Sequence, residues 1–143
     1  MKKNKGGFTL IEILVVIGII AILATIVIIA INPSRQFSQA RDTERVSNVN
    51  ALLNAIGQNM ADNKGLFTCG LVTLPTSVKN IGSAVSNVDL ASCLVPTYIS
   101  SMLMDPVGGT LGDTKYTVIQ DPTTKRVTVA ATGEITPVIA VTR

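Results

Sequence analysis

The longest hydrophobic run of the chain covers residues 8–31 and reads FTLIEILVVIGIIAILATIVIIAI. Glu12 is the one charged residue within these 24 positions. About 20 apolar residues cross a bilayer as a helix, and at about 1.5 Å per residue this run forms a rod of roughly 36 Å. The pattern therefore predicts a transmembrane helix over residues 8–31.

The hydrophobic pattern changes after Ile31. Asn32-Pro33 interrupts the run, and two readings stay open: a kink in one helix, or a new helix that Asn32 caps with Pro33 in its first turn. From Ser34 to about Asn63 apolar residues recur at three-four spacing, which predicts an amphipathic helix ended by Gly65 in a left-handed cap. The apolar stripe consists of Val49, Leu52, Leu53, Ile56 and Met60.

The second half of the chain predicts a connecting region and then a sheet. Residues 66–106 lack clean periodicity, and we expect short helical pieces at 77–85 and 96–103. Alternating patterns at 115–120, 126–130 and 134–141 predict an antiparallel meander of about three strands, with Pro137 placing the last strand at an edge or a bulge. The predicted fold is α+β: a long N-terminal helix packed on a small C-terminal sheet.

Glu12 is anomalous in a membrane-spanning run. A lone carboxylate in the apolar part of a span costs about 2.5 to 3.5 kcal/mol. A cut between Gly7 and Phe8 would create an α-amine one helical turn before Glu12, within reach of its carboxylate. We therefore expect Glu12 to pair with the amine of Phe8, within one molecule or between neighbouring ones.

The run KKNKGGFTLIE at residues 2–12 resembles the leader and processing site of type IV pilins and of type II secretion pseudopilins. The resemblance implies that a prepilin peptidase cuts the Gly7–Phe8 bond and methylates Phe8, and that Glu12 guides subunits into a helical filament. It also implies a pilin-like fold with a helix-breaking position, here Pro33. A cut after Gly6 stays an alternative, because the glycine is doubled.

Two ordinary explanations of the N-terminus fit less well. A secretory signal peptide has an apolar region of about 7 to 15 residues, which is shorter than this run. An ordinary signal anchor gives no reason for Gly-Phe-Thr-Leu-Ile-Glu at the lipid boundary. We therefore expect a leader at 1–7, a transmembrane and assembly helix at 8–31, and an extracytoplasmic domain at 32–143 that includes the amphipathic helix.

Charge supports the orientation of the chain but not binding to nucleic acid. The formal charge of +3 includes Lys2, Lys3 and Lys5, and without the leader nine basic residues oppose nine acidic ones. The three lysines hold the N-terminus in the cytoplasm by the positive-inside rule. The predicted location is a single-pass inner-membrane precursor whose mature form lies in an extracellular or periplasmic filament.

Cys69 and Cys93 then lie in an oxidising compartment, where a disulfide is the default state. Closing a loop of about 25 residues is worth about 3.5 kcal/mol by loop-closure entropy. Two free thiols are the alternative. The chain has no histidine, so the cysteines are poor material for a metal site.

The remaining polar residues predict neither a cofactor nor a catalytic site, because no nucleophile has an identifiable base. Residues 98–108 resemble the segment that introduces the sheet in major pseudopilins, although Val107 replaces the usual aromatic residue. A calcium loop near the C-terminus occurs in that group, and four aspartates here are possible oxygen ligands, but their spacing matches no EF-hand and their role as turn formers is favoured, so no metal site is predicted. The four are Asp89, Asp105, Asp113 and Asp121.

A group of charges on the amphipathic helix has two open interpretations. It forms a solvated face with weak salt bridges, or it meets its counterparts on adjacent subunits. Its members are Arg35, Arg41, Asp42, Glu44 and Arg45.

The function that the sequence predicts is that of a structural subunit of a type IV pilus-like filament. The alternatives are a secretion pseudopilin, a competence pilin, and a monomeric membrane-anchored binding module that uses residues 66–97. The expected partners are further copies of the chain, a prepilin peptidase, an assembly motor with its platform protein, and the membrane.

Overall fold

The computed structural model describes residues 7–143, which form two compact units divided between Phe37 and Ser38. The predicted leader lies outside the described residues, except for Gly7. Helix α1 (Leu10–Ile31) has a mean hydropathy of 3.4 and is long and apolar enough to cross a membrane. None of its residues is buried within the unit.

Asn32 separates α1 from α2 (Pro33–Asp62). Its backbone is left-handed, with φ of 46°, and its side-chain oxygen accepts a hydrogen bond from the N–H of Arg35 at 3.4 Å. Asn32-Pro33 is therefore not a kink within one helix. Asn32 caps a new helix, and Pro33 occupies its first position.

Helix α2 supplies one wall of the core in the unit of residues 38–143. Val49, Leu52, Leu53 and Ile56 are buried, and Met60 packs against them half-exposed. The helix ends as predicted, because Gly65 has a φ of 88° and its N–H donates to the carbonyl of Met60 at 2.7 Å.

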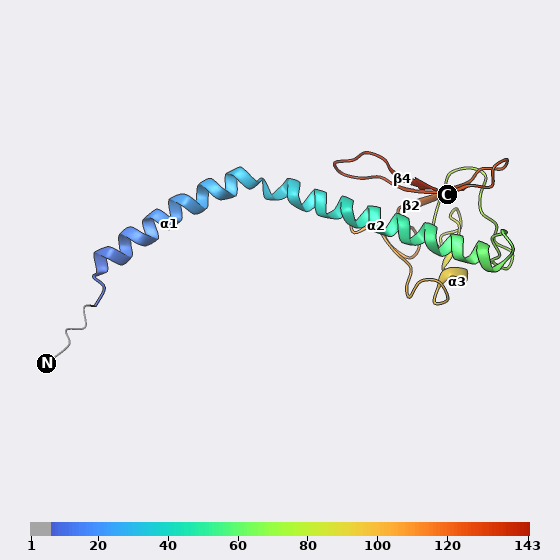
Figure 1. Ribbon diagram of the computed structural model, residues 1–143, viewed down its shortest axis with the longest axis horizontal. Coiled ribbons are helices and arrows are strands. Elements are labelled where there is room, and N and C mark those ends of the chain that lie inside the picture. The colour runs from blue at the N-terminus through green and yellow to red at the C-terminus, as the bar shows by residue number, and fades with distance from the viewer. Residues whose placement is uncertain (1–6) are drawn as a thin grey trace. The chain divides into compact units, whose positions relative to one another are not determined.

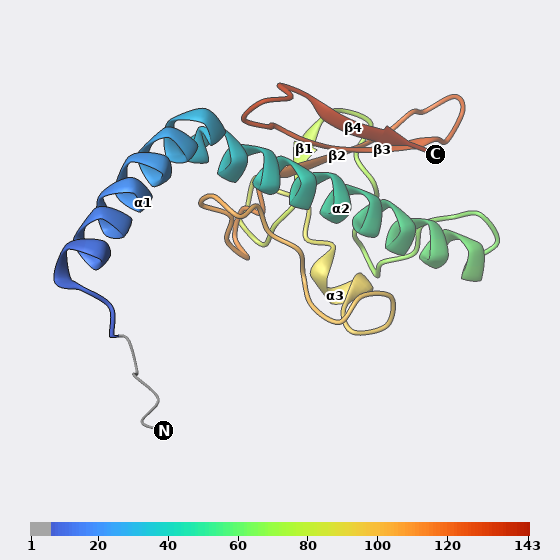
Figure 2. The same cartoon turned by 60° about the vertical axis from the view of Figure 1, so that its left-hand side comes forward.

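The sheet has four antiparallel strands in the order β1-β2-β3-β4, which confirms the α+β fold. Alternate residues of the central strands are buried against α2, and in both views the sheet lies along one side of the later turns of that helix (Figures 1 and 2). The predicted meander corresponds to β2 to β4, and β1 adds a short edge. The strands are β1 (Lys79–Asn80), β2 (Tyr116–Gln120), β3 (Val127–Ala131) and β4 (Ile139–Thr142).

Two short helices were predicted wrongly. Within residues 77–85 the structure has β1, because Lys79 and Asn80 pair with β2. Residues 96–103 form turns, and the one short helix of this region, α3 (Ala91–Leu94), lies earlier in the chain. The carboxylate of Asp89 accepts the N–H of Ala91 at 2.9 Å and so fixes the start of α3.

The last strand is shorter than predicted. Residues 134–138 form a loop, and β4 begins at Ile139 as an edge strand. The N–H groups of Glu134, Ile135 and Thr136 donate to the carboxylate of Asp42 at 2.8 to 3.0 Å instead of joining the ladder. Pro137 has no N–H to offer, so pairing resumes only after it.

Cys69 and Cys93 form a disulfide with a Cα–Cα distance of 5.3 Å. It joins the segment after α2 to α3 and closes a loop with a sequence separation of 24. We expect the paired change Cys69→Ser and Cys93→Ser to lower the free energy of unfolding by about 3.5 kcal/mol. Urea unfolding of the detergent-solubilised chain measures this, and an unchanged midpoint would contradict it.

Candidate functional site

The start of α1 holds a reciprocal set of hydrogen bonds between Thr9 and Glu12. The Glu12 carboxylate accepts the backbone N–H and the hydroxyl of Thr9, both at 2.8 Å, and the Thr9 hydroxyl oxygen accepts the N–H of Glu12 at 3.3 Å. This is a capping box, with Thr9 as the N-cap and Glu12 at the third helical position. It lies directly after Gly7 and Phe8.

The capping box gives the Glu12 carboxylate partners in the uncut chain. From the sequence, the expected partner of Glu12 was an amine created by cleavage, and the role of Thr9 was missed. The signal was present as Thr9-Leu-Ile-Glu12, since a threonine followed three residues later by glutamate before an apolar run is typical of this motif. Glu12 is therefore held in the first helical turn, with its carboxylate on Thr9, before any cut.

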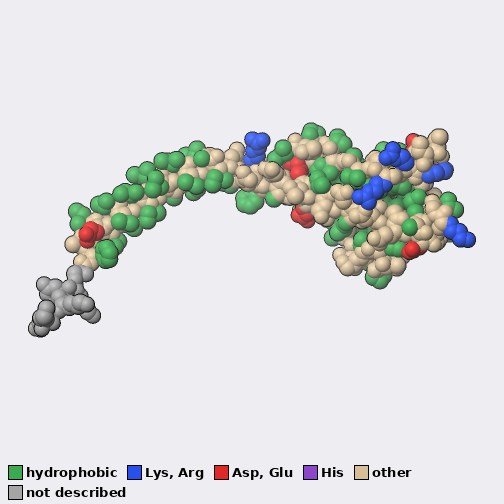
Figure 3. All heavy atoms as spheres, viewed as in Figure 1, with side chains coloured by type: hydrophobic (Ala, Val, Ile, Leu, Met, Phe, Trp, Pro, Cys, Tyr) green, Lys and Arg blue, Asp and Glu red, His purple; other side chains and the backbone are tan. Residues whose placement is uncertain are grey.

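The remainder of α1 offers an apolar surface that no described residue of its own unit, 7–37, covers. Figure 3 shows hydrophobic side chains along the whole helix, and every large one is at least half exposed. Such a surface requires lipid or the apolar helices of other molecules around it. One polar side chain in the middle of α1, Thr25, satisfies itself by donating to the carbonyl of Ala21 at 2.8 Å.

The charges on α2 are not all a solvated face, because that interpretation is wrong for Asp42 and Arg45, which are buried. Arg45 is 3% exposed and forms a bidentate pair with Asp105, at 2.6 and 3.0 Å. The same guanidinium donates to Asp42 at 2.8 Å and to Glu134 at 3.1 Å. Arg45 thus ties α2 to the turn at Asp105 and to the β3–β4 loop.

Glu134 completes this charge network at the surface. Its carboxylate accepts two hydrogen bonds from Arg41, at 2.5 and 2.6 Å, and one from the Ser38 hydroxyl at 2.8 Å. These bonds lower the pKa of Glu134 from 4.5 to about 2. The backbone N–H groups of the β3–β4 loop, aided by Arg45, hold the pKa of Asp42 far below its usual value.

The depressed pKa of Glu134 predicts acid sensitivity. A carboxyl with a lower pKa in the folded state stabilises that state above its unfolded value of 4.5, and this contribution is lost as the pH falls toward about 2. We expect the urea midpoint of the full chain to fall between pH 4.5 and pH 2, and to fall less in Glu134→Gln. Identical pH profiles for the two proteins would contradict this.

The four aspartates of the possible calcium site do not converge. Asp105 is paired with Arg45, Asp113 with Lys115 at 2.9 Å, and Asp121 accepts the N–H groups of its own turn. Asp89 caps α3. Within residues 7–143 no three potential ligands group together. These carboxylates fit their turns and ion pairs, and they do not fit a shared cation.

Residues 2–28 match the family model of the prokaryotic N-terminal methylation motif. The match includes Gly7, Phe8 and Glu12, and it is characteristic of the prepilin-type signal of type IV pilins and pseudopilins. The chain therefore carries the motif of a pilin-like or pseudopilin substrate of prepilin peptidase. Comparisons with curated proteins and with solved structures returned no match.

Proposed function

We propose that the chain is a structural subunit, major or minor, of a type IV pilus-like filament. Prepilin peptidase removes residues 1–7 and methylates Phe8, and the mature chain then packs through α1 against the same helix of neighbouring subunits. The lipid-facing surface of the stored precursor becomes helix-to-helix surface in the fibre, so the apolar side chains stay covered at both stages. An assembly motor and its platform protein drive the transfer.

The observation that carries the proposal is the position of Glu12. A carboxylate held in the first turn of an otherwise apolar helix lies one turn after the Gly7–Phe8 bond. Cleavage there places a cation beside an anion at the membrane surface. That pair is available to a neighbouring helix as well as to its own, and it fixes the axial position of one subunit against the next.

The processing step has a direct test. We expect intact-mass and N-terminal peptide analysis of the mature protein to show a chain that begins at Phe8 and carries one methyl group on the α-nitrogen. A chain that retains its leader would overturn the proposal. A start at Gly7 would show that the cut follows Gly6 and that Glu12 occupies the sixth mature position.

A secretion pseudopilin is the second candidate, favoured by the turn at Asp105. The carboxylate of Asp105 accepts the N–H of Val107 at 2.7 Å, and Gly108 follows with a φ of 76°. The disulfide between Cys69 and Cys93 favours a surface pilin. Deletion of the gene distinguishes the two, because a pseudopilin mutant retains secreted proteins in the cell while a pilin mutant loses surface fibres.

A monomeric binding module anchored by α1 predicts a different result. A soluble fragment that starts near Ser34 would then keep its activity without the helix. A filament subunit that lacks α1 does not assemble.

A further inference from the structure

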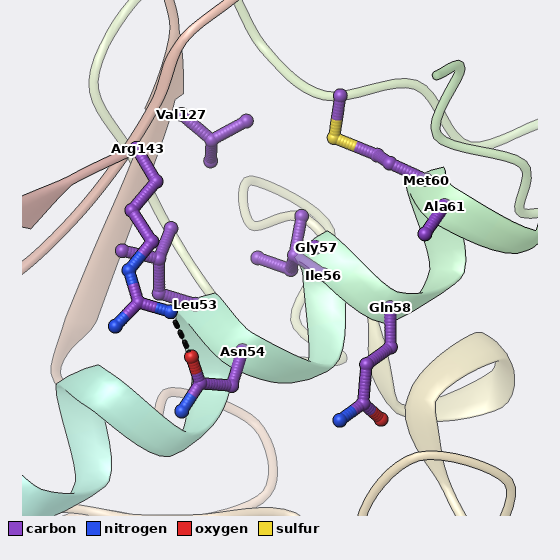
Figure 4. Close-up of a pocket in the computed structure, with 9 residues that line it drawn as sticks. All are labelled: Leu53, Asn54, Ile56, Gly57, Gln58, Met60, Ala61, Val127 and Arg143. Atoms are coloured by element: carbon purple, nitrogen blue, oxygen red, sulfur yellow. Dashed lines mark hydrogen bonds between the residues drawn. The ribbon is translucent and has the colours of Figure 1, made fainter. Parts of the chain in front are cut away.

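A groove of about 440 Å³ lies between α2 and the C-terminal end of the sheet. Leu53, Ile56, Met60 and Val127 give it an apolar lining, and none of its lining residues is acidic. Figure 4 shows Arg143, which follows β4, extending across the groove toward α2, where its guanidinium donates to the side-chain oxygen of Asn54.

Gly57 opens the α2 side of this groove. Glycine inside a helix is less stable than alanine by about 0.5 to 1 kcal/mol, and a Cβ atom built at Gly57 meets nothing within 4 Å. Neither the backbone conformation nor any neighbouring atom of the described chain requires a glycine here. Because Gly57 has no side chain, atoms of another molecule have room to come close to the backbone of α2 here.

The charges at the groove indicate which surface binds there. Arg143 contacts a neutral amide and no carboxylate of the described residues. Glu44, exposed on α2, is the one carboxylate side chain within residues 7–143 that has neither a hydrogen bond nor an ion pair. The residues one turn to either side of it are Ala40 and Ser47, which are small, and Arg41 and Asn48, which are half-buried and bonded to Glu134 and Tyr116. Among the described residues, Glu44 is therefore the one unpaired charge on this face of α2. An apolar groove with one cation complements that face.

We propose that the groove is a docking site for a second copy of the chain, which places its Glu44 beside Arg143. The inference rests on the filament function proposed above. Ten residues separate Glu44 from Asn54, the partner of Arg143, along one helix. They correspond to about 15 Å and about 2.8 turns. Between copies whose α2 helices run parallel, as in the proposed filament, the contact requires a shift along the helix axis, so it is a head-to-tail contact of the kind that generates an open array.

Charge exchange tests the pair in cells that express the full chain. We expect Glu44→Arg or Arg143→Glu alone to reduce sedimented fibre mass about fivefold, and the double exchange to restore it. The matched control combines Glu44→Arg with Arg126→Glu, which reverses an exposed arginine outside the groove lining, and restores nothing. Single variants that assemble like the wild type, or a double exchange as deficient as the single ones, would overturn the pair.

Filling the groove tests the docking site independently of charge. Gly57→Leu places a side chain into open space, so we expect the urea midpoint to be unchanged or raised while fibre mass falls at least fivefold. Gly57→Ala also favours the helix but leaves the groove open, and it assembles normally. Normal assembly of Gly57→Leu would overturn the docking site and leave the filament function standing. A wild-type chain that is cut at Phe8 and forms no fibres would overturn both.

Discussion

Glu12→Ala is expected to abolish fibres while the leader is still removed. The substitution leaves Gly7 and Phe8 intact, so the peptidase retains its bond, but the new amine of Phe8 has no counterion in the assembled helices. An uncompensated charge at the edge of an apolar span costs about 3 kcal/mol, which is roughly a hundredfold change in the assembly equilibrium. Electron microscopy of sheared envelopes and the mass of the N-terminal peptide measure the two outcomes separately.

A second variant in α1 controls for a general effect on the helix. Thr25 is the other polar side chain within α1, and its hydroxyl is satisfied by the carbonyl of Ala21 in the same helix. We expect Thr25→Val to assemble normally, because no charge loses its partner. Fibres of Glu12→Ala in wild-type amounts would show that Glu12 has no part in assembly, whatever the fate of the leader.

The start of α1 was largely predictable because its signals are local. Gly7, Phe8 and Glu12 lie within six residues, and the apolar run after them is long enough to cross a membrane. The signal for Thr9 is equally local, and it was missed because only charged partners were considered for Glu12. A hydroxyl and a backbone N–H satisfy the same carboxylate before the chain is cut.

The helices and strands of residues 38–143 were predictable where the hydrophobic periodicity is strong. They were unpredictable where side chains distant in sequence determine the backbone conformation. The stripe from Val49 to Ile56 and the alternation in β2 and β3 gave the helix, the strands and their packing. The shortening of β4 depends on Asp42, which lies more than 90 residues away in sequence and takes the N–H groups that a strand would use. No local pattern contains that information.

The burial of Arg45 was also hidden in the sequence, since five charges near one another on a helix are typical of a solvated face. Arg45 lies at three-four spacing before Val49 and Leu52, on the face that packs against the sheet. Its partners come from the turn at Asp105 and from the β3–β4 loop. The position of the arginine on the buried stripe was the available signal.

Arg45→Met is therefore expected to destabilise the domain strongly. Removing one partner of a buried ion pair leaves uncompensated carboxylates and costs about 3 to 5 kcal/mol. Both tyrosines of the chain lie in residues 38–143 and there is no tryptophan, so tyrosine fluorescence during urea unfolding reports on this unit alone. The matched control, Arg126→Met, removes an exposed arginine that pairs with no carboxylate of residues 7–143, and should change the free energy by less than about 0.5 kcal/mol.

A second substitution distinguishes lost charge pairing from lost packing. Asn at position 105 is nearly isosteric with Asp and keeps an oxygen for the N–H of Val107, but it carries no charge. If unpaired carboxylates cause the loss of stability, the double variant with Arg45→Met and Asp105→Asn is more stable than Arg45→Met. The reason is that the charge of Asp105, which Arg45→Met leaves buried without a partner, is then gone. If the arginine acts by filling space, the double variant is no more stable than Arg45→Met. We expect recovery, since the guanidinium of Arg45 makes four hydrogen bonds to three carboxylates.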